Sequence, residues 1–316
     1  MLKTVICDLF SIEHPIIQGG MAHVATAELV SAVANAGGLG ILGTGFYPPD
    51  WVRQQIRATR QQTSRPFGVN IQLASPVIKE VVAVILAEKV AVVTTGAGNP
   101  EPYISRFKEA GIKIMPVIAD VNSAKRLEHA GVDALVAEGT ESGGHVGETT
   151  TMVLVPQVVD SVRIPVVAAG GIADGRGLVA ALALGAQGIQ MGTRFVCSQE
   201  CTAHPRYKQK ILEAHDRSTV VTRQTLGRPL RTLRNALSDQ FLALEQAGAS
   251  KEELELFDRG RMYLGLVEGN TEDGSLLAGQ IAGMIKEIKP VKVIIEEIIA
   301  EAERIITGLN KYHRRD

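Results

Sequence analysis

The sequence of 316 residues has little of several features that mark whole classes of protein. It contains only three cysteines, and an odd number of thiols without a disulfide framework predicts a reducing compartment, the cytoplasm. Its most apolar runs, such as 81–87 and 153–159, are too short to span a bilayer. The net charge is −1, which argues against a chain that binds a polyanion as a whole. We therefore expect a cytoplasmic protein without a membrane or nucleic-acid partner.

Aromatic residues are also scarce, at 4% of the chain, whereas apolar residues make up 45% and glycine is abundant with 32 residues. This composition is typical of α/β proteins, in which buried strands of Val, Ile and Ala are joined by glycine turns. A strand-like run followed by a helix-like run recurs at intervals of about 20 to 25 residues. The predicted strands lie in 14–21, 39–42, 67–73, 90–95, 112–118, 133–138, 164–169 and 188–191.

Eight such units within about 200 residues fit a (β/α)₈ TIM barrel better than an open sheet, which usually has fewer strands. The rhythm stops after Cys197, and residues 199–284 read as helices and turns. An amphipathic helix is expected from Pro290 to about Leu309, with its apolar face on the barrel. The sequence thus predicts a barrel domain over 1–198, a smaller, mainly helical lid over 199–284, and a C-terminal helix within 285–316 that returns to the barrel.

In a barrel of this kind, chemistry is confined to the loops that follow the strands. The stretch 137–147 follows the sixth predicted strand and holds His145 among four glycines. Glycine lets the backbone approach a ligand closely, and a histidine changes its charge near neutral pH. We therefore take His145 as the candidate catalytic residue, the alternative being a tight turn with a solvated imidazole.

The loops after the seventh and eighth predicted strands carry Gly170, Gly171 and Gly192. Glycines at these two positions of a barrel present backbone N–H groups where such folds commonly bind phosphate. The alternative is that the glycines only turn the chain.

Three other patterns are weaker. The run Gly38 to Gly43 matches G-x-G-x-x-G, but it lies between a helix and a strand, which is the wrong order for a dinucleotide site. Cys197, Cys201 and His204 lack a fourth metal ligand nearby, so we expect no metal site. No nucleophile elbow of the form G-x-S-x-G is present, which disfavours acyl-enzyme chemistry.

Taken together, the loops resemble the FMN-dependent superfamily of nitronate monooxygenase and enoyl-acyl-carrier-protein reductase II. The resemblance runs from about residue 8 to past 283 and is closer to the reductase branch in 138–145, 203–208 and 274–283. In addition, Gly20 and Val146 stand where nitronate-oxidising relatives often have Pro and Arg. The segments that carry the resemblance are 18–22, 36–40, 67–70, 138–147, 168–175, 190–195, 203–208 and 274–283.

The resemblance implies an FMN at the barrel mouth and reduction of trans-2-enoyl thioesters of acyl carrier protein or CoA by NADH or NADPH, in bacterial fatty-acid elongation. His145 would protonate the substrate or polarise its carbonyl, and His23 is a weaker candidate that we expect at the surface. The implied FMN-binding residues are Gly170, Gly171, Gly192 and Thr193 at the phosphate, Gly20, Met21, Asn70 and Gln190 around the ring, and Glu138, Gly143 and Met191 nearby.

The resemblance also raises a monovalent cation as an activator, and a homodimer is the default assembly. Two other functions stay open at this point. One is a nitronate monooxygenase that uses the same FMN site, O₂ and His145 as a base. The other is a catalytically idle barrel that binds a phosphate or a flavin.

A local excess of basic residues lies between His204 and Arg234, where eight Lys and Arg residues face only Glu213 and Asp216. We interpret it as an electropositive cap that steers an acidic carrier protein or grips phosphates, or as an ordinary solvated helical face.

Overall fold

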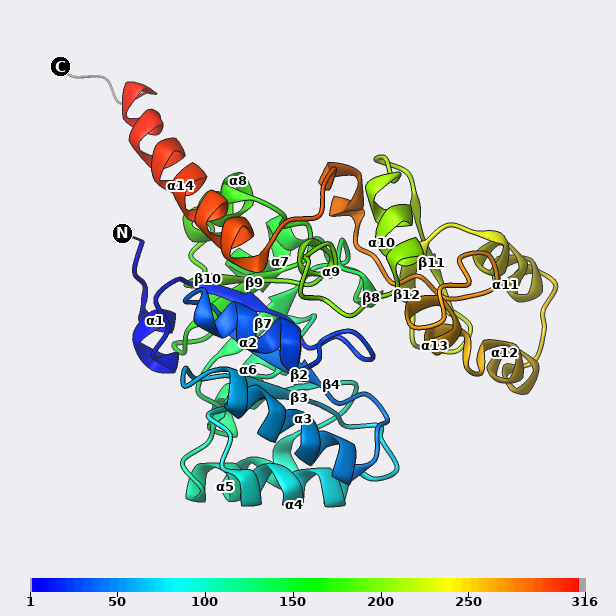
Figure 1. Ribbon diagram of the computed structural model, residues 1–316, viewed down its shortest axis with the longest axis horizontal. Helices are drawn as coiled ribbons and strands as arrows, with labels where there is room; N and C mark the ends of the chain where they lie inside the picture. The colour runs from blue at the N-terminus through cyan, green and yellow to red at the C-terminus, as the bar shows by residue number, and fades with distance from the viewer. Residues whose placement is uncertain (1, 313–316) are drawn as a thin grey trace.

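The computed structural model describes residues 2–312 and is built around a nine-stranded parallel sheet, with a smaller unit to one side (Figure 1). The order of the strands is β5-β4-β3-β2-β1-β10-β9-β7-β6. They are β1 (Ile16–Gln18), β2 (Leu39–Gly43), β3 (Gly68–Gln72), β4 (Val92–Gly96), β5 (Lys113–Ile114), β6 (Val117–Ile118), β7 (Leu135–Glu138), β9 (Val166–Ala169) and β10 (Gly188–Met191).

The two strands at the ends of this order, β5 and β6, are halves of one extended segment interrupted at Pro116, which has no N–H to donate. The backbone bridges the interruption on both sides. Met115 N donates to Val93 O at 2.9 Å, and Val136 N donates to Pro116 O at 2.9 Å. The segment 113–118 therefore occupies one position between β4 and β7, and the sheet returns on itself with eight positions, as in a (β/α)₈ barrel. All eight predicted strands are present.

Helices alternate with these strands and pack their apolar faces on the outside of the sheet. Two of them begin at aspartate caps, where Asp120 accepts from Ser123 N and Asp174 from Arg176 N and Gly177 N. The helices of the barrel are α2 (Ala27–Asn35), α3 (Pro49–Gln62), α4 (Ile78–Glu88), α5 (Glu101–Glu109), α6 (Val121–His129), α7 (Thr151–Val159), α8 (Gly175–Ala183) and the short α9 (Thr193–Val196).

A helix that the sequence pattern did not reveal, α1 (Val5–Phe10), closes one end of the barrel. Its buried Ile6, Cys7 and Phe10 join a second core, separate from the main one, with residues inside the barrel such as Ile17 and Met115. Because that core includes Leu39 and Val92, the first residues of their strands, α1 covers the N-terminal ends of the strands. The open end of the barrel is therefore the one where the strands end.

The helices and strands between residues 205 and 284 lie together to one side of the barrel and are here called the cap (Figure 1). The prediction of helices and turns is incomplete, because β11 (Thr219–Thr222) and β12 (Leu230–Leu233) pair antiparallel within it. A third strand, β8 (Gly144–His145), comes from the barrel loop itself and pairs with β12. The helices of the cap are α10 (Pro205–Leu212), α11 (Ala236–Gln246), α12 (Lys251–Asp258), α13 (Arg261–Leu266) and the 3₁₀ turn η1 (Gln280–Met284).

The C-terminal helix, α14 (Val291–Leu309), packs on α8 and α2 as the sequence predicts, and the turn η2 (Asn310–Tyr312) follows it. Gly175 lets α14 come close, because a Cβ there would lie 2.6 Å from Ala302 N. Gly175 N also donates to Glu301 Oε2 at 2.8 Å. The helix thus buttresses the start of α8, directly behind the loop that follows β9. No helix among residues 2–312 is long and apolar enough to cross a membrane.

Candidate active site

The loops after β1 and β2 are fitted against Asn70, the middle residue of β3, and Asn70 in turn contacts Thr94 of β4. A Cβ on Gly20 would lie 2.2 Å from Asn70 Cβ, so only glycine lets the loop after β1 pass at this point. Asn70 Nδ2 donates to Thr94 Oγ1 at 2.9 Å, and Asn70 O accepts from Thr44 Oγ1 at 2.8 Å. The backbone of Gly20 and the amide of Asn70 are thereby held in one fixed surface of the mouth.

The loops after β9 and β10 lie side by side, because these strands are neighbours with Ala169 opposite Gln190. Gly170 and Gly171 have φ of +91° and +71°, which is left-handed backbone that suits glycine. Within residues 2–312, the backbone N–H groups of Gly171, Gly192 and Thr193 donate no hydrogen bond to a protein acceptor. Three unpaired donors on two adjacent loops fit an anion such as a phosphate group.

The two residues that precede Gly192 point in opposite directions. Gln190 faces the inside of the barrel, where its Cδ would lie 3.1 Å from a Cβ on Gly19. Met191 is 2% exposed and belongs to the main core between sheet and helices, so its side chain does not reach the mouth. Of the expected ligand contacts, Met191 can therefore contribute only its backbone, and its carbonyl already accepts from Gly19 N at 3.0 Å.

The loop after β7 is held by two carboxylates with different roles. Glu141 accepts hydrogen bonds from Thr151 N and Thr151 Oγ1, both at 2.9 Å, and so ties the loop to the start of α7. Glu138 accepts one hydrogen bond, from Ser142 Oγ at 2.6 Å. Burial raises the pKa of Glu138 from 4.5 to about 7, and the Ser142 hydroxyl opposes this rise. The mouth therefore contains a carboxyl group that titrates near neutral pH.

His145 lies on β8, where its backbone pairs with Leu230 of β12, and its side chain is exposed at the junction of barrel and cap. Its pKa lies below the ordinary 6.5, first because its surroundings desolvate the charged form and then because Arg223 and Arg228 repel it. Asp258 opposes this effect. The imidazole is thus neutral at pH 7 and can donate or accept a hydrogen bond. Gly143, two residues earlier, leaves room for the cap, since a Cβ there would lie 2.6 Å from the carbonyl carbon of Ala278.

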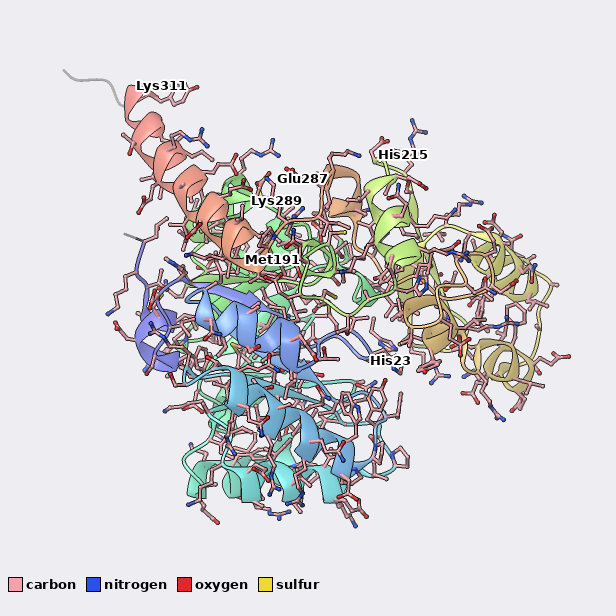
Figure 2. The ribbon with its side chains drawn as sticks, viewed as in Figure 1. His23, Met191, His215, Glu287, Lys289 and Lys311 are labelled. Carbon is pink, nitrogen blue, oxygen red and sulfur yellow. The ribbon has the colours of Figure 1, made fainter. Side chains whose placement is uncertain are left out.

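His23 is not the surface residue that we expected. It is half-buried on the loop that reaches from the barrel toward the cap (Figure 2). Its Nδ1 lies 2.9 Å from the hydroxyl of Tyr47, and its ring packs edge-on to Tyr47 and to Tyr263 of α13 at centroid distances of 5.2 and 5.6 Å. Desolvation lowers its pKa. Tyr47 also stacks on Trp51 at 3.9 Å, so an aromatic cluster that sequence reasoning missed joins barrel and cap.

The interpretation of 204–234 as an electropositive cap is wrong for most of its basic residues. Lys208, Arg223 and Arg231 are buried and serve the fold, Lys208 Nζ donating to Ser198 O and Cys201 O. Three of the exposed ones are paired with carboxylates that lie outside residues 204–234, so the pattern of that segment could not show them. These ion pairs are Lys210–Glu272 at 3.5 Å, Arg228–Glu255 at 3.2 Å and Arg234–Asp239 at 2.8 Å.

The cysteines are buried thiols. Burial raises the pKa of Cys197 to about 12 and also raises that of Cys201, so neither is a ready ligand or nucleophile at neutral pH. His204 instead accepts a hydrogen bond from Arg206 N at the start of α10. Within residues 2–312, no group of three or more His, Cys, Asp or Glu side chains is arranged to hold a metal ion.

Comparison with known proteins agrees with this geometry. The sequence profile described as nitronate monooxygenase matches residues 3–81 and 72–301. The solved structure of FabK from Thermotoga maritima, an enoyl-acyl-carrier-protein reductase II, superposes with a TM-score of 0.97 at 51% identity, covering 99% of this chain and 100% of that one.

Two further relatives are similar in sequence. A (3aS,4S,5R,7aS)-5-hydroxy-7a-methyl-1-oxo-octahydro-1H-indene-4-carboxyl-CoA dehydrogenase of Mycobacterium tuberculosis is 36% identical, over 95% of this chain and 96% of its own length. A probable nitronate monooxygenase of Staphylococcus saprophyticus is 38% identical over 74% of this chain and 79% of its own. With the family profile spanning most of its length and its relatives being flavin oxidoreductases, the chain belongs to the nitronate monooxygenase family, as its loop motifs predict.

Proposed function

We propose that this protein is an FMN-dependent reductase of trans-2-enoyl thioesters carried on acyl carrier protein or CoA, with NADH or NADPH as the reductant. The observation that carries the proposal is its 51% identity to FabK of Thermotoga maritima over 99% of the chain. The mouth of the barrel fits the cofactor, because the unpaired backbone N–H groups of Gly171, Gly192 and Thr193 lie where its phosphate is needed. A flavin supplies a site that accepts hydride from a nicotinamide and later gives hydride to the enoyl β-carbon.

The residues of the chain then have separate tasks. Gly170, Gly171, Gly192 and Thr193 hold the phosphate of FMN. Gly20, Met21, Asn70 and Gln190 form the surface around its ring, and Glu138, Gly143 and the Met191 backbone lie nearby. We further propose that residues 1–198 form the FMN domain, that 199–284 act as a lid over it, and that 285–316 brace the barrel, the structure describing this last part only to residue 312.

His145 would act on the thioester carbonyl of the substrate. A neutral imidazole donates an N–H hydrogen bond to that oxygen, which favours charge moving from the α-carbon toward it as hydride arrives at the β-carbon. The lowered pKa of His145 suits this task, because the imidazole stays neutral over most of the physiological pH range. The proton that the α-carbon finally needs comes from His145 or from Glu138, whose pKa of about 7 leaves it partly protonated.

A nitronate monooxygenase is the second candidate, favoured by the family profile and by the relative from Staphylococcus saprophyticus. His145 would then take a proton as a base, and the cofactor would be reoxidised by O₂ without any nicotinamide. A monovalent cation as activator and a homodimer remain predictions under either function.

An anaerobic half-reaction tests the choice. FMN-loaded protein is mixed with NADH or with NADPH, the flavin absorbance is followed, and crotonyl-CoA is then added. Bleaching by a nicotinamide followed by rapid recovery on crotonyl-CoA is the expected result. If neither nicotinamide bleaches the flavin while an alkyl nitronate does, the protein is a monooxygenase and not a reductase.

His145→Ala separates catalysis from cofactor binding. We expect the recovery with crotonyl-CoA to slow by a factor of about 10² to 10³, the size typical of a lost donor to a developing oxyanion, with FMN content unchanged. Unchanged recovery would remove His145 from the chemistry, and loss of FMN would make its role structural. The matched control is His129→Ala, on the outer helix α6.

A further inference from the structure

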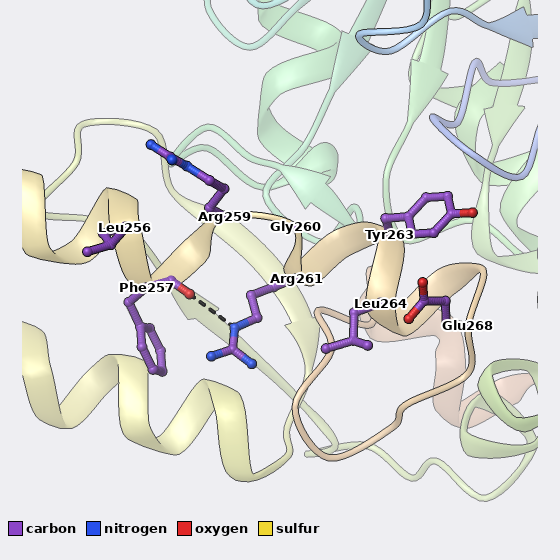
Figure 3. A pocket seen from close by; sticks show the side chains of 8 residues that line it. All are labelled: Leu256, Phe257, Arg259, Gly260, Arg261, Tyr263, Leu264 and Glu268. Carbon is purple, nitrogen blue, oxygen red and sulfur yellow. Dashed lines mark hydrogen bonds between the residues drawn. The ribbon is translucent and has the colours of Figure 1, made fainter.

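A cleft of about 580 Å³ opens in the cap at the turn between α12 and α13, and none of the roles proposed above uses it. Figure 3 shows Arg259 and Arg261 on either side of the turn at Gly260, with Tyr263 reaching away from α13. The volume lies within the range of sites for small molecules and cofactors. The lining residues are Leu256, Phe257, Arg259, Gly260, Arg261, Tyr263, Leu264 and Glu268.

The positive charge of this cleft is not neutralised as it is elsewhere in the cap. Among residues 2–312, no carboxylate lies within salt-bridge distance of Arg259 or Arg261. Arg261 donates only to backbone, to Phe257 O at 3.1 Å and Asp273 O at 3.3 Å. The nearby carboxylates are engaged by other arginines, Asp258 with Arg223 and Glu255 with Arg228. The guanidinium group of Arg259 is therefore free to bind a phosphate group, whereas that of Arg261 is held against Phe257 and two backbone carbonyls.

The cleft also offers flat surfaces and one acceptor. Arg261 lies over the ring of Phe257 at 5.1 Å, and Tyr263 is 44% exposed. A purine can stack on either the planar guanidinium or the tyrosine ring. The exposed carboxylate of Glu268 can accept hydrogen bonds from the hydroxyls of a ribose, as acidic residues do in dinucleotide sites.

The cleft lies next to the proposed active site. Tyr263 packs against His23, whose loop begins at Gly20 beside Asn70. A long ligand seated in the cleft by one end could therefore extend past the His23 loop into the barrel mouth.

We propose that this cleft binds the adenosine diphosphate end of a nucleotide co-substrate, with Arg259 on the phosphates, Tyr263 against the purine and Glu268 on a ribose. The assignment to a co-substrate rests on the proposed reductase function. Two molecules in that reaction carry adenosine diphosphate, the reduced nicotinamide dinucleotide and CoA, and both would leave their reactive end free for the barrel. NADH offers Glu268 both hydroxyls of the adenosine ribose, whereas NADPH and CoA carry a phosphate on one of them.

Titration calorimetry with ADP on the FMN-loaded protein tests the site directly. We expect Arg259→Glu to weaken ADP binding by about five- to tenfold, because it reverses an exposed charge beside the phosphates. Arg106→Glu on α5, another exposed arginine without an ion pair in the described chain, should change binding less than about twofold. ADP that does not bind, or binds equally to both variants, overturns the proposal.

Steady-state kinetics then show whether the adenosine diphosphate group in the cleft belongs to the dinucleotide or to CoA. If the cleft holds the dinucleotide, Arg259→Glu raises the KM for NADH or NADPH with any acyl acceptor. If it holds CoA, the variant raises the KM for crotonyl-CoA but not for the crotonyl thioester of N-acetylcysteamine, which lacks ADP. An unchanged KM for every substrate overturns the co-substrate role.

The calorimetric experiment and the anaerobic half-reaction test the cleft and the proposed function separately. A protein that reduces crotonyl-CoA but does not bind ADP keeps the proposed function and loses the cleft. A protein that binds ADP through Arg259 but reduces no enoyl thioester keeps the cleft as an ADP site and loses the proposed function.

Discussion

The barrel side and the cap side of the proposed site present different chemical groups. On the barrel side the surface is backbone, shaped by glycines such as Gly20 and Gly170 and offering N–H groups without side-chain charge. On the cap side the surface is made of charged side chains, most of which neutralise one another, as Arg223 and Asp258 do. Backbone donors in a barrel mouth are fixed by the strands below them, whereas side-chain charges depend on partners that must also be present. The barrel side therefore suits a resident cofactor, and the cap side suits substrates that come and go.

The largest effect on stability should come from breaking the ion pair between Arg223 and Asp258 inside the cap. Arg223 is 4% exposed, adopts a φ of +65°, and pairs with Asp258 and Ser275 Oγ. Arg223→Met leaves Asp258 without its partner and should lower the free energy of unfolding by about 3 to 5 kcal/mol. Urea unfolding measures this, with Arg228→Met as the control, because the exposed Arg228–Glu255 pair is worth less than about 1 kcal/mol. Equal effects of the two variants would contradict the contrast between buried and exposed pairs.

A second, somewhat smaller effect concerns Glu138, a half-buried carboxyl group in the barrel mouth. The pKa of Glu138 is raised from 4.5 to about 7 in the folded protein, so the folded state binds the proton more tightly than the unfolded chain. Its contribution to stability is thus fully present below pH 4.5 and is lost as pH rises through 7, by at most about 3 kcal/mol.

The variant Glu138→Gln removes that titration and keeps an acceptor for Ser142. It should be more stable than the natural protein at pH 8 and equal to it near pH 4.5, as thermal melts at the two pH values would measure. A constant difference across this range would mean that Glu138 titrates normally.

The smallest of the three effects should appear in the backbone of the barrel mouth. Gly170→Ala places a Cβ 2.8 Å from Gly139 O at a φ of +91°. We expect a cost of about 2 kcal/mol and FMN binding weakened about tenfold or more, measured by flavin fluorescence on dilution. Gly111→Ala is the matched control, since Gly111 has a φ of +72° and nothing within 4 Å of the added Cβ. If Gly111→Ala releases FMN as readily, the geometry at Gly170 is not what holds it.

The same contrast explains what the sequence could predict. The strands of the barrel and the glycines of its loops follow from a local rhythm of apolar runs and turns, and every predicted strand is present, although Pro116 divides the fifth. Gly20 and Gly170 can be singled out from the sequence because a glycine is recognised without knowing its spatial neighbours, and their role at the cofactor stays a prediction. The run Gly38 to Gly43 was correctly separated from dinucleotide motifs, since a Cβ on Gly40 would lie 2.3 Å from Val30 O of α2, which is helix packing.

The cap could not be predicted in this way, because its organisation depends on contacts distant in sequence. The strands β11 and β12 are four residues each and are completed by β8 from the barrel, about 80 residues earlier. Arg223 reads as a surface charge until Asp258 is placed beside it. His23 likewise reads as a surface residue until Tyr263 of α13 covers it. Counting the charges of one segment cannot reveal partners that lie elsewhere in the sequence.

The closure of the barrel by α1 has a consequence for the order of events under the proposed function. With Ile6 and Phe10 filling the N-terminal end, we expect both reactants to reach the cofactor from the open end of the barrel. If the nicotinamide and the enoyl thioester compete for that entrance, the spent nicotinamide leaves before the thioester enters, and the enzyme alternates between two half-cycles.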